Sequence, residues 1–384
     1  MKTILLISQS SSLSGGGEED FLKLLKQLQK KFRIISIFPE GERVSEYAKY
    51  SDISLTVKGM VFPFSAFRLK SYVGFFIRNF RKIYKIYYFL KKNGPVDLCF
   101  ANSSVCFPDL VPVVLLKIPY IVSVKEKINP VLIRKLIFIF YKKTSIKILT
   151  ISNYLRNIIS KENNLKSIEV IYSALDEKDY IKYSDKLNLS KIRDGNFSIL
   201  NIGSIYPLKG QKVLIDALYR ISSDSVTVDF IGQVVNHRYY EELKNLVKIY
   251  SLDRRVTFLG EMMRNDVIRK IDEADCIVIT SKEEGQSMVV LESLLMEKPL
   301  ITTKVGISLE IIKDGENGLT YNYGNPEELS NTIVKLKNDK DLYNRIAKNS
   351  KKTYLDNFNN EKSLYKYEEI IRNCLDSISK NNEV

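Results

Sequence analysis

The sequence predicts an α/β protein made of two open sheet domains in series, which we assign to residues 1–175 and 196–355. Short apolar runs alternate with amphipathic helical stretches in both halves, and a polar, charged segment at residues 176–195 separates them as a linker. This alternation is typical of parallel strands that are covered by helices on both faces. The 384 residues are enough to give each domain a core of its own.

Six apolar runs in the first half are predicted to be strands. They cover residues 3–8, 33–38, 96–101, 120–124, 146–151 and 168–172. Helical stretches separate several of these runs. The clearest helix spans residues 18–31, where Phe21, Leu24, Leu25 and Leu28 share one face.

The same pattern restarts in the second half. Strands are predicted at residues 198–202, 226–231, 256–259, 276–280 and 300–303, with helices at 209–221 and 239–250, followed by an amphipathic tail at 341–379. Open parallel sheets bind ligands at the carboxyl ends of their strands. A site is therefore expected directly after the strands, in the cleft that the two sheets would share.

The strongest local signal follows the predicted strand at residues 276–280. Gly285 permits a close approach of the backbone to a ligand, and Ser287 is a candidate N-cap of the next helix. A strand, a glycine turn and a helix N-terminus together form an anion site. Glu284 before this helix and Glu292 inside it are candidates to accept hydrogen bonds from sugar hydroxyls. The alternative is that Glu284 is a turn carboxylate and Glu292 a solvated helix residue.

A second loop supplies a cation. Gly203 and Ser204 follow the predicted strand at residues 198–202, and Lys209 stands where this loop enters the next predicted helix. A lysine at such a position can neutralise a phosphate, and the alternative is an ordinary exposed lysine. Further turns, at Gly306 and residues 314–318, are expected at the same strand ends.

In their order and spacing, these segments resemble the retaining glycosyltransferases of family 4, part of the glycosyl transferases group 1, which have the GT-B fold. The family's two glutamates, separated by seven residues, appear as Glu284 and Glu292, and residues 203–210 are similar to its phosphate-binding loop. Residues 15–17 resemble its glycine loop after the first strand. The resemblance extends over nearly the whole chain. It implies two Rossmann-like domains that face each other across a cleft, with a C-terminal helix (residues 356–384) crossing back to the first domain.

The resemblance implies roles for these residues. Glu284 and Lys209 are expected to be catalytic, with Glu284 near the reacting carbon of the sugar and Lys209 on the diphosphate. Glu292 is expected to hold the ribose hydroxyls. The remaining expected donor-binding residues are Gly16, Gly17, Gly203, Ser204, Gly285, Ser287, Met288 and Val289. No metal and no cofactor are expected, because Lys209 and a helix N-terminus would supply the positive charge and the nucleotide sugar is a substrate.

The sequence departs from the family at the phosphate loop and at the first glutamate. Ser204 stands where the family usually has arginine, which removes half of the usual cationic clamp, and Arg238 is one candidate substitute. Gln286 and Ser287 stand where an aromatic residue and a glycine are frequent.

A further departure lies at the predicted strand of residues 120–124, after which many relatives have a histidine. Here Lys125 and Glu126 follow, and both are candidate residues on the acceptor side. The only histidine, His237, is expected on the surface, so a Ser-His-Asp hydrolase is not supported.

Positive charge is confined to the first half. Residues 1–175 carry 28 Lys and Arg against 12 Asp and Glu, whereas the remaining residues carry 31 against 33. Residues 53–96 and 127–161 contain no acid, and residues 62–92 mix their bases with many aromatic side chains. This stretch is interpreted as a core helix with a solvated basic face, as a helix on an anionic membrane surface, or as a nucleic-acid-binding element. No nucleic-acid-binding motif accompanies it, so no nucleic acid partner is expected.

The sequence thus predicts an enzyme that moves a sugar from a nucleotide-diphosphate sugar to a glycan or lipid-linked acceptor, in bacterial surface polysaccharide synthesis. Four cysteines without metal-ligand spacing, and apolar runs too short to span a bilayer, favour a cytoplasmic protein at the inner face of the cell membrane. Two alternatives are a nucleotide-sugar epimerase of the same fold and a non-catalytic nucleotide- or glycan-binding protein.

Overall fold

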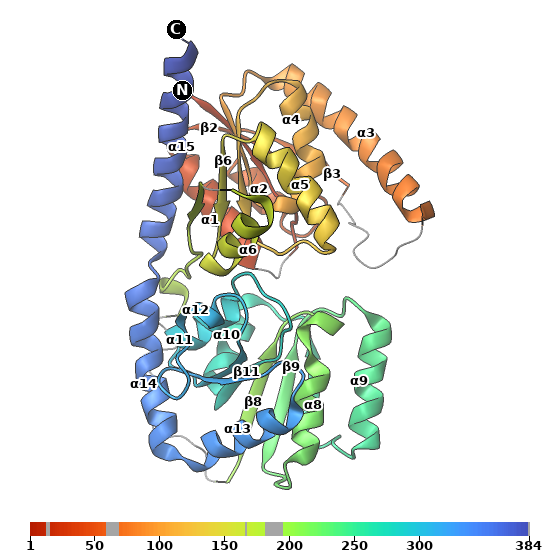
Figure 1. The fold of residues 1–384 in the computed structure, drawn as a ribbon, viewed down its shortest axis with the longest axis vertical. Coiled ribbons are helices and arrows are strands. Elements are labelled where there is room, and N and C mark those ends of the chain that lie inside the picture. The colour runs from red at the N-terminus through yellow and green to blue at the C-terminus, as the bar shows by residue number, and fades with distance from the viewer. Residues whose placement is uncertain (13–15, 59–68, 166, 181–194, 383–384) are drawn as a thin grey trace. The chain divides into compact units, whose positions relative to one another are not determined.

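The protein divides into two compact units, and we describe each by itself (Figure 1). Unit 1 comprises residues 1–173 and 361–384, and unit 2 comprises residues 174–360. The structure is a computed structural model that describes residues 1–12, 16–58, 69–165, 167–180 and 195–382. Most of the predicted linker, residues 181–194, lies outside the described residues.

Unit 1 is built on a parallel sheet of seven strands in the order β3-β2-β1-β4-β5-β6-β7. The strands are β1 (Thr3–Ile7), β2 (Arg33–Pro39), β3 (Ile53–Val57), β4 (Leu98–Ala101), β5 (Tyr120–Val124), β6 (Lys147–Thr150) and β7 (Ile168–Val170). Alternate residues of each strand point to opposite faces, so Leu5 and Ile7 join one core while Ile4 and Leu6 join the other. Both faces are apolar, which is why the central strands consist of uninterrupted apolar runs.

Helices cover both faces of this sheet. One face carries α1 (Gly16–Leu28), α2 (Val44–Lys49) and the C-terminal helix α15 (Asn360–Asn382). The other carries α3 (Leu69–Asn93), α4 (Val111–Leu115), α5 (Val131–Thr144) and α6 (Asn153–Asn163), with a 3-10 turn at Ser104–Leu110 before α4. The predicted face of α1 is confirmed, because Phe21, Leu24, Leu25 and Leu28 are all buried.

The helix α15 belongs to unit 1 although it lies at the end of the chain, and it runs beside that unit in Figure 1. Tyr367 and Ile371 pack into the core that α1 shares with the sheet. The carboxylate of Glu368 accepts hydrogen bonds from Lys31 at 2.7 Å and from Gln27 at 3.0 Å. The expected return of the C-terminal helix to the first domain is therefore confirmed.

Unit 2 contains a second parallel sheet, of six strands in the order β10-β9-β8-β11-β12-β13. The strands are β8 (Phe197–Ile202), β9 (Val226–Ile231), β10 (Val256–Gly260), β11 (Cys276–Ile279), β12 (Leu300–Thr303) and β13 (Leu319–Tyr321). The helices are α8 (Gln211–Arg220), α9 (His237–Ile249), α10 (Arg264–Glu273), α11 (Met288–Leu295), α12 (Ser308–Ile311), α13 (Pro326–Asn338) and α14 (Lys340–Asn357). The predicted α/β class with two parallel sheets is confirmed.

Two strands were missed by the sequence patterns, and both lie at the edge of a sheet. β3 is only partly buried, and β13 has three residues and follows directly on the turn at residues 314–318. β3 mixes exposed and partly buried residues and β13 is very short, so neither shows the apolar run by which the longer strands were found. The tail predicted as one element is two helices, and α14 belongs to unit 2.

Over the parts of the chain that the structure describes, no helix is both long enough and apolar enough to cross a lipid bilayer.

Candidate functional site

The candidate site in unit 2 lies where β8 and β11 end. These two strands are neighbours in the sheet, so the loops that follow them lie side by side at one edge. The β8 loop ends in a 3-10 turn at Pro207–Lys209, and Gly210 then begins α8 with a φ of +66°. The hydroxyl of Thr280, directly after β11, donates to the carbonyl of Lys209 at 2.6 Å, which ties the two loops together.

Lys209 and Glu284, which are 75 positions apart in sequence, meet in this edge. The ammonium of Lys209 lies 2.5 Å from Oε1 of Glu284, and Ser281 donates to the same oxygen at 2.7 Å. Burial lowers the pKa of Lys209, but the charge and hydrogen bond of Glu284 outweigh burial and raise it above its ordinary value. Lys209 is therefore a cation at neutral pH, and its side chain keeps 23% exposure.

Close backbone contacts hold this pair in place. The aliphatic chain of Lys209 lies over Gly203, at 3.5 Å from the position that a Cβ would take. Gly306, with a φ of +54°, approaches the turn from the loop after β12. A Cβ there would lie 2.8 Å from the carbonyl oxygen of Gly285 and 2.9 Å from that of Glu284. These distances leave no room for a side chain, so the glycine at 306 sets the position of the Glu284 turn.

The helix α11 begins as predicted, with Ser287 at its N-cap position. The predicted N-cap position is confirmed, and the Ser287 side chain makes no capping hydrogen bond. Gly285, Ser287, Met288 and Val289 are all half-buried. Amides at such a helix start attract an anion because their dipoles add.

Glu292 lies inside α11 and is buried, with 1% of its side chain exposed. Its Oε1 atom pairs with Arg264 at the start of α10 and accepts the hydroxyl of Tyr180 at 3.4 Å. The guanidinium of Arg264 also lies over the ring of Tyr180, 5.5 Å from its centroid. The alternative that Glu292 is a solvated helix residue is therefore wrong. Sequence reasoning missed Arg264 and Tyr180, since nothing in their local sequence indicates a shared buried carboxylate.

Ser204, which stands where the family usually has arginine, is held through its backbone. The carbonyl of Ser204 accepts a hydrogen bond from the side chain of Gln211 at 3.0 Å, which links the β8 loop to α8. Arg238 is exposed on the first turn of α9. Its substitution for the missing arginine stays a prediction. Arg264, paired with Glu292, is a second cation beside a candidate site residue, and the sequence did not indicate it.

The predicted residues of the first half assemble within unit 1. Gly16 and Gly17 begin α1, and a Cβ on Gly17 would lie 4.0 Å from the side chain of Lys125. The ammonium of Lys125 pairs with Asp20 at 3.0 Å, and Asn102 donates to the carbonyl of Gly17 at 3.1 Å. The carboxyl ends of β1, β4 and β5 thus hold one connected polar cluster.

Glu126 belongs to the same edge of the unit 1 sheet. Its carboxylate accepts the hydroxyls of Ser103 at 2.8 Å and of Ser104 at 2.6 Å. Burial raises the pKa of Glu126, and these two hydrogen bonds oppose the rise only in part. A carboxyl group held in this way can keep a proton at a higher pH than a solvated glutamate.

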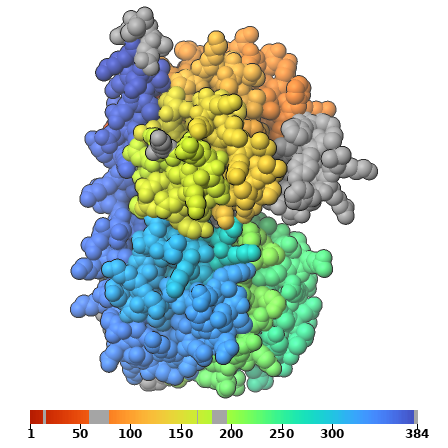
Figure 2. All heavy atoms as spheres, viewed as in Figure 1, coloured from red at the N-terminus to blue at the C-terminus, as the bar shows by residue number. Residues whose placement is uncertain are grey.

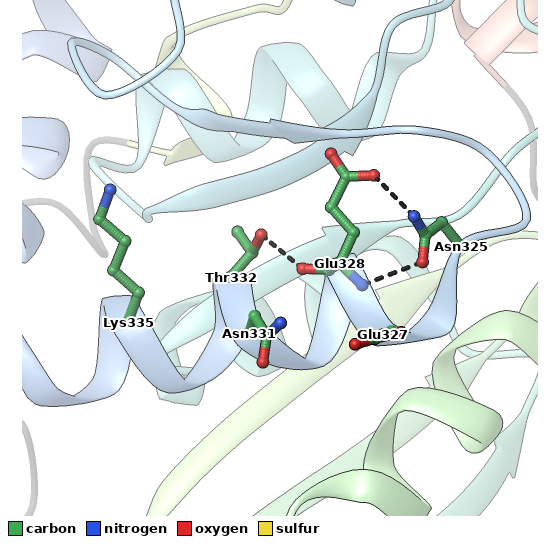
Figure 3. A pocket seen from close by; sticks show the side chains of 6 residues that line it. All are labelled: Asn325, Glu327, Glu328, Asn331, Thr332 and Lys335. Carbon is green, nitrogen blue, oxygen red and sulfur yellow. Dashed lines mark hydrogen bonds between the residues drawn. The ribbon is translucent and has the colours of Figure 1, made fainter.

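Unit 2 also has a hollow away from the candidate site, and polar groups that line it take part in capping a helix. It runs along α13 and is lined by Asn325, Glu327, Glu328, Asn331, Thr332 and Lys335 (Figure 3). Asn325 caps the helix by accepting the amide of Glu328 at 3.1 Å, and the Glu328 carboxylate accepts the amide of Asn322 at 3.0 Å. These contacts satisfy the turn before the helix, and the hollow contains none of the candidate site residues.

Comparison with known proteins agrees with this geometry. Residues 185–353, which carry Lys209, Glu284 and Glu292, match the family described as glycosyl transferases group 1. Solved structures extend the likeness over both units and confirm the GT-B fold. The Anabaena protein Alr3699/HepE in complex with UDP-glucose superposes with a TM-score of 0.79 at 19% identity, covering 97% of this chain and 100% of that one. Sucrose-phosphate synthase from Thermosynechococcus elongatus gives 0.80 at 16% identity, covering 98% and 100%.

Curated relatives match this chain over little more than half their own length. An uncharacterized glycosyltransferase of Methanocaldococcus jannaschii, MJ1178, is 29% identical over 215 residues, 56% of each chain. The N-acetyl-alpha-D-glucosaminyl L-malate synthase of Bacillus anthracis is 24% identical over 214 residues, 55% of each. The O-antigen chain mannosyltransferase RfbU of Salmonella typhimurium is 26% identical over 222 residues, 56% of this chain and 58% of the relative.

Proposed function

We propose that this protein transfers a sugar from a nucleotide-diphosphate sugar to a glycan or lipid-linked acceptor, with retention of the anomeric configuration. The observation that carries the proposal is the Lys209–Glu284 ion pair at the strand ends, next in sequence to the start of α11. A cation, a carboxylate and helix amides are the groups that a sugar diphosphate requires: positive charge for the phosphates and an acceptor for the hydroxyls.

In this proposal Lys209 serves the leaving group. The bond between the anomeric carbon and the diphosphate oxygen breaks, and negative charge grows on that oxygen while the acceptor hydroxyl attacks from the same face. The acceptor's proton passes to the departing diphosphate, so charge and atoms balance. Lys209 and the α11 amides stabilise the developing charge without a metal ion. One such contact is worth about 3 kcal/mol in the transition state.

Glu284 and Glu292 hold the two ends of the donor. Glu284 lies beside Lys209, so a sugar whose diphosphate binds Lys209 has its hydroxyls within reach of this carboxylate. Glu292 takes the ribose hydroxyls while Arg264 keeps its charge balanced in the buried position. The complexes of the Anabaena protein with UDP and with UDP-glucose support a nucleotide-sugar donor by likeness of fold.

The setting that we propose is bacterial surface polysaccharide synthesis at the cytoplasmic face of the cell membrane. The name of the Salmonella relative, an O-antigen chain mannosyltransferase, supports this setting. The basic first half of the chain supports an anionic or lipid-linked acceptor, because its excess of positive charge attracts an anionic partner from a distance.

The test is donor binding followed by turnover. Sugars linked to UDP, GDP, ADP and dTDP are screened for thermal stabilisation of the protein, and we expect one nucleotide to raise the melting temperature. Glu292→Ala should lose this shift, whereas Glu310→Ala in α12 should keep it. If Glu292→Ala binds the donor as well as the parent chain, the ribose assignment is wrong.

Turnover then separates the proposal from its two alternatives. A transferase releases nucleoside diphosphate when donor and acceptor are both supplied. An epimerase converts the donor without an acceptor, and a binding protein stabilises with the donor but releases nothing. Either of the last two outcomes would replace the proposed function.

A further inference from the structure

The outer side of one helix layer in unit 1 is unusually apolar. α3, α4, α5 and α6 all pack one face of the sheet through their inner sides, in a single core. Their outer sides face away from that core. In Figure 2 the surface of α5, coloured yellow, lies open on the visible face of unit 1. Residues 59–68 and the side chains of residues 69–78 lie outside the described part of this layer.

On α5, three large aliphatic residues form an exposed stripe. Leu132, Leu136 and Ile139 are 68%, 59% and 49% exposed. Their spacing of four and three residues places them on one face of the helix. The opposite face is anchored inward through Ile137, Phe138 and Tyr141.

On α3, three aromatic residues form a second stripe. Phe80, Tyr84 and Tyr88 are spaced four residues apart and are 69%, 57% and 51% exposed. The inner side of the same helix is fixed by Ile86 and Leu90 in the core. On each helix this spacing makes a stripe of large apolar side chains, and both helices belong to the layer on one face of the sheet.

Lysines surround both stripes. Exposed bases on the two helices include Lys85, Lys91, Lys92, Lys135, Lys142 and Lys143. These positions lie on or beside the apolar stripes, at the helical spacing that brings them to the outer side.

The acids of this layer are engaged elsewhere. Asp109 pairs with the buried Lys82 at 2.5 Å, and Glu162 pairs with the buried Arg134 at 2.6 Å. Glu126 is held by two serine hydroxyls at the strand ends. In the described segments from residue 69 to residue 165, the remaining acid is Asp97. It pairs with Lys2 at 3.0 Å and accepts the amide of Thr3 at the start of β1. The outer side of α3 and α5 is thus apolar and positive.

We propose that the outer face of α3 and α5 binds the surface of an anionic lipid bilayer, with the aliphatic and aromatic side chains among the headgroups and the lysines on the lipid phosphates. Amphipathic helices with apolar residues flanked by bases bind membranes in this way. A second copy of this face fits less well, because it would bring lysines against lysines. Nucleic acid would match the charge but leaves the aliphatic stripe on α5 without a partner.

This inference rests on the proposed function in one respect: a lipid-linked acceptor would explain why the protein has a membrane-binding surface. Its test uses neither donor nor acceptor, so a failure to bind lipid leaves sugar transfer untouched. The full chain is floated with vesicles of phosphatidylglycerol and phosphatidylcholine, and in parallel with vesicles of phosphatidylcholine alone. We expect binding to the first kind, weakened by salt, and little binding to the second.

Two sets of variants locate the contact. Lys135→Ala/Lys142→Ala/Lys143→Ala should weaken binding to the anionic vesicles by roughly fivefold for each lysine. Leu132→Ser/Leu136→Ser should weaken it by about tenfold, because less apolar surface enters the headgroup region. Matched controls in unit 2 are Ile249→Ser, which is 73% exposed on α9, and Lys335→Ala/Lys340→Ala/Lys348→Ala on α13 and α14. These should bind as the parent chain does.

Each other outcome overturns the inference. Equal loss in the controls, equal binding to neutral vesicles, or no binding at all would exclude an anionic bilayer on this face. A dimer in light scattering without lipid, abolished by Leu132→Ser/Leu136→Ser, would assign the face to a second copy. Competition by a short DNA duplex that the Leu132→Ser/Leu136→Ser variant still binds normally would reduce the surface to a general polyanion site. Thermal unfolding of each variant in parallel checks that the fold is intact.

Discussion

Arg264 at the start of α10 forms an ion pair with Glu292, whose side chain is buried inside unit 2. Arg264 keeps 35% exposure, so the pair connects a buried carboxylate to the surface. Both the arginine and the hydroxyl of Tyr180 use the same oxygen, Oε1. We therefore expect a ribose hydroxyl to bind at Oε2, with Arg264 in place.

Removing Arg264 should destabilise unit 2. The variant Arg264→Met leaves the Glu292 carboxylate buried without its cation, and we expect the free energy of unfolding to fall by about 2 kcal/mol. Urea denaturation measures the change. The matched control is Arg269→Met on the same helix, because Arg269 is exposed and pairs with the exposed Asp266. A pair of that kind is worth less than about 1 kcal/mol.

The double variant Arg264→Met/Glu292→Gln separates charge from packing. It removes the buried charge together with its partner, so part of the lost stability should return. If the double variant is as unstable as the two single variants added together, the two side chains act independently and the pair does not carry this energy.

Lys209→Met should strongly slow transfer while leaving the fold intact. The variant keeps the aliphatic chain that lies over Gly203 but removes the cation, so we expect turnover to fall about 100- to 1000-fold. Release of nucleoside diphosphate measures it. Lys212→Met, three residues on in α8, is the control, because its ammonium pairs with Asp216 within the helix. Equal losses in both variants would mean that the effect comes from α8 and not from the phosphate contact.

Most of the fold could be predicted from the sequence, because most strands and helices show their pattern within a short stretch of residues. β5 is almost wholly apolar and β9 alternates apolar with polar residues, and the structure gives both strands the predicted bounds. The edge strands β3 and β13 could not be found, because β3 has only one fully buried residue and β13 is only three residues long. Lys209 and Glu284 could be proposed for one site because their loops follow strands of one sheet. Their ion pair, in contrast, depends on β8 and β11 being neighbours, and strand order is not written in local periodicity.

The rest of the site depends on contacts that are distant in sequence. Tyr180, Arg264 and Glu292 come from three separate segments, and the burial of Glu292 follows from packing that no local pattern encodes. The exposed stripe on α5 could not be predicted from the sequence for the same reason. Leu132 and Ile137 are equally apolar in sequence, and only the position of the sheet decides that one is exposed and the other buried.

Gly210→Ala should destabilise unit 2 through a backbone clash. Gly210 has a φ of +66°, and a Cβ there would lie 2.3 Å from the carbonyl oxygen of Thr280. Strain and clash together should lower the free energy of unfolding by about 2–4 kcal/mol. Gly324→Ala is the matched control, since its φ is +78° with nothing within 4 Å of the added Cβ. It should lose only about 1 kcal/mol from backbone strain. Equal losses in denaturation would mean that the contact with Thr280 is relieved by movement.

The attachment of α15 to unit 1 should depend on pH through Glu368. Burial raises the pKa of Glu368, but hydrogen bonds from Lys31, Arg372 and Gln27 outweigh burial and hold it below its ordinary value of 4.5. The folded protein therefore binds a proton at this site less readily than the unfolded chain does. The stabilisation is complete above the ordinary pKa and is lost as the pH falls through the folded value.

Glu368→Gln removes this ionisation and should lower the free energy of unfolding of unit 1 by about 1–2 kcal/mol at pH 7. The difference between parent and variant should shrink as the pH falls below 4.5, because the parent then loses the same charge. Urea denaturation at pH 7 and at acidic pH, followed by a signal from unit 1, measures both values. Glu369→Gln, at the exposed neighbouring position, is the control and should show no such dependence. A constant difference at all pH values would mean that the glutamine disturbs packing, and that the charge of Glu368 does not hold α15 in place.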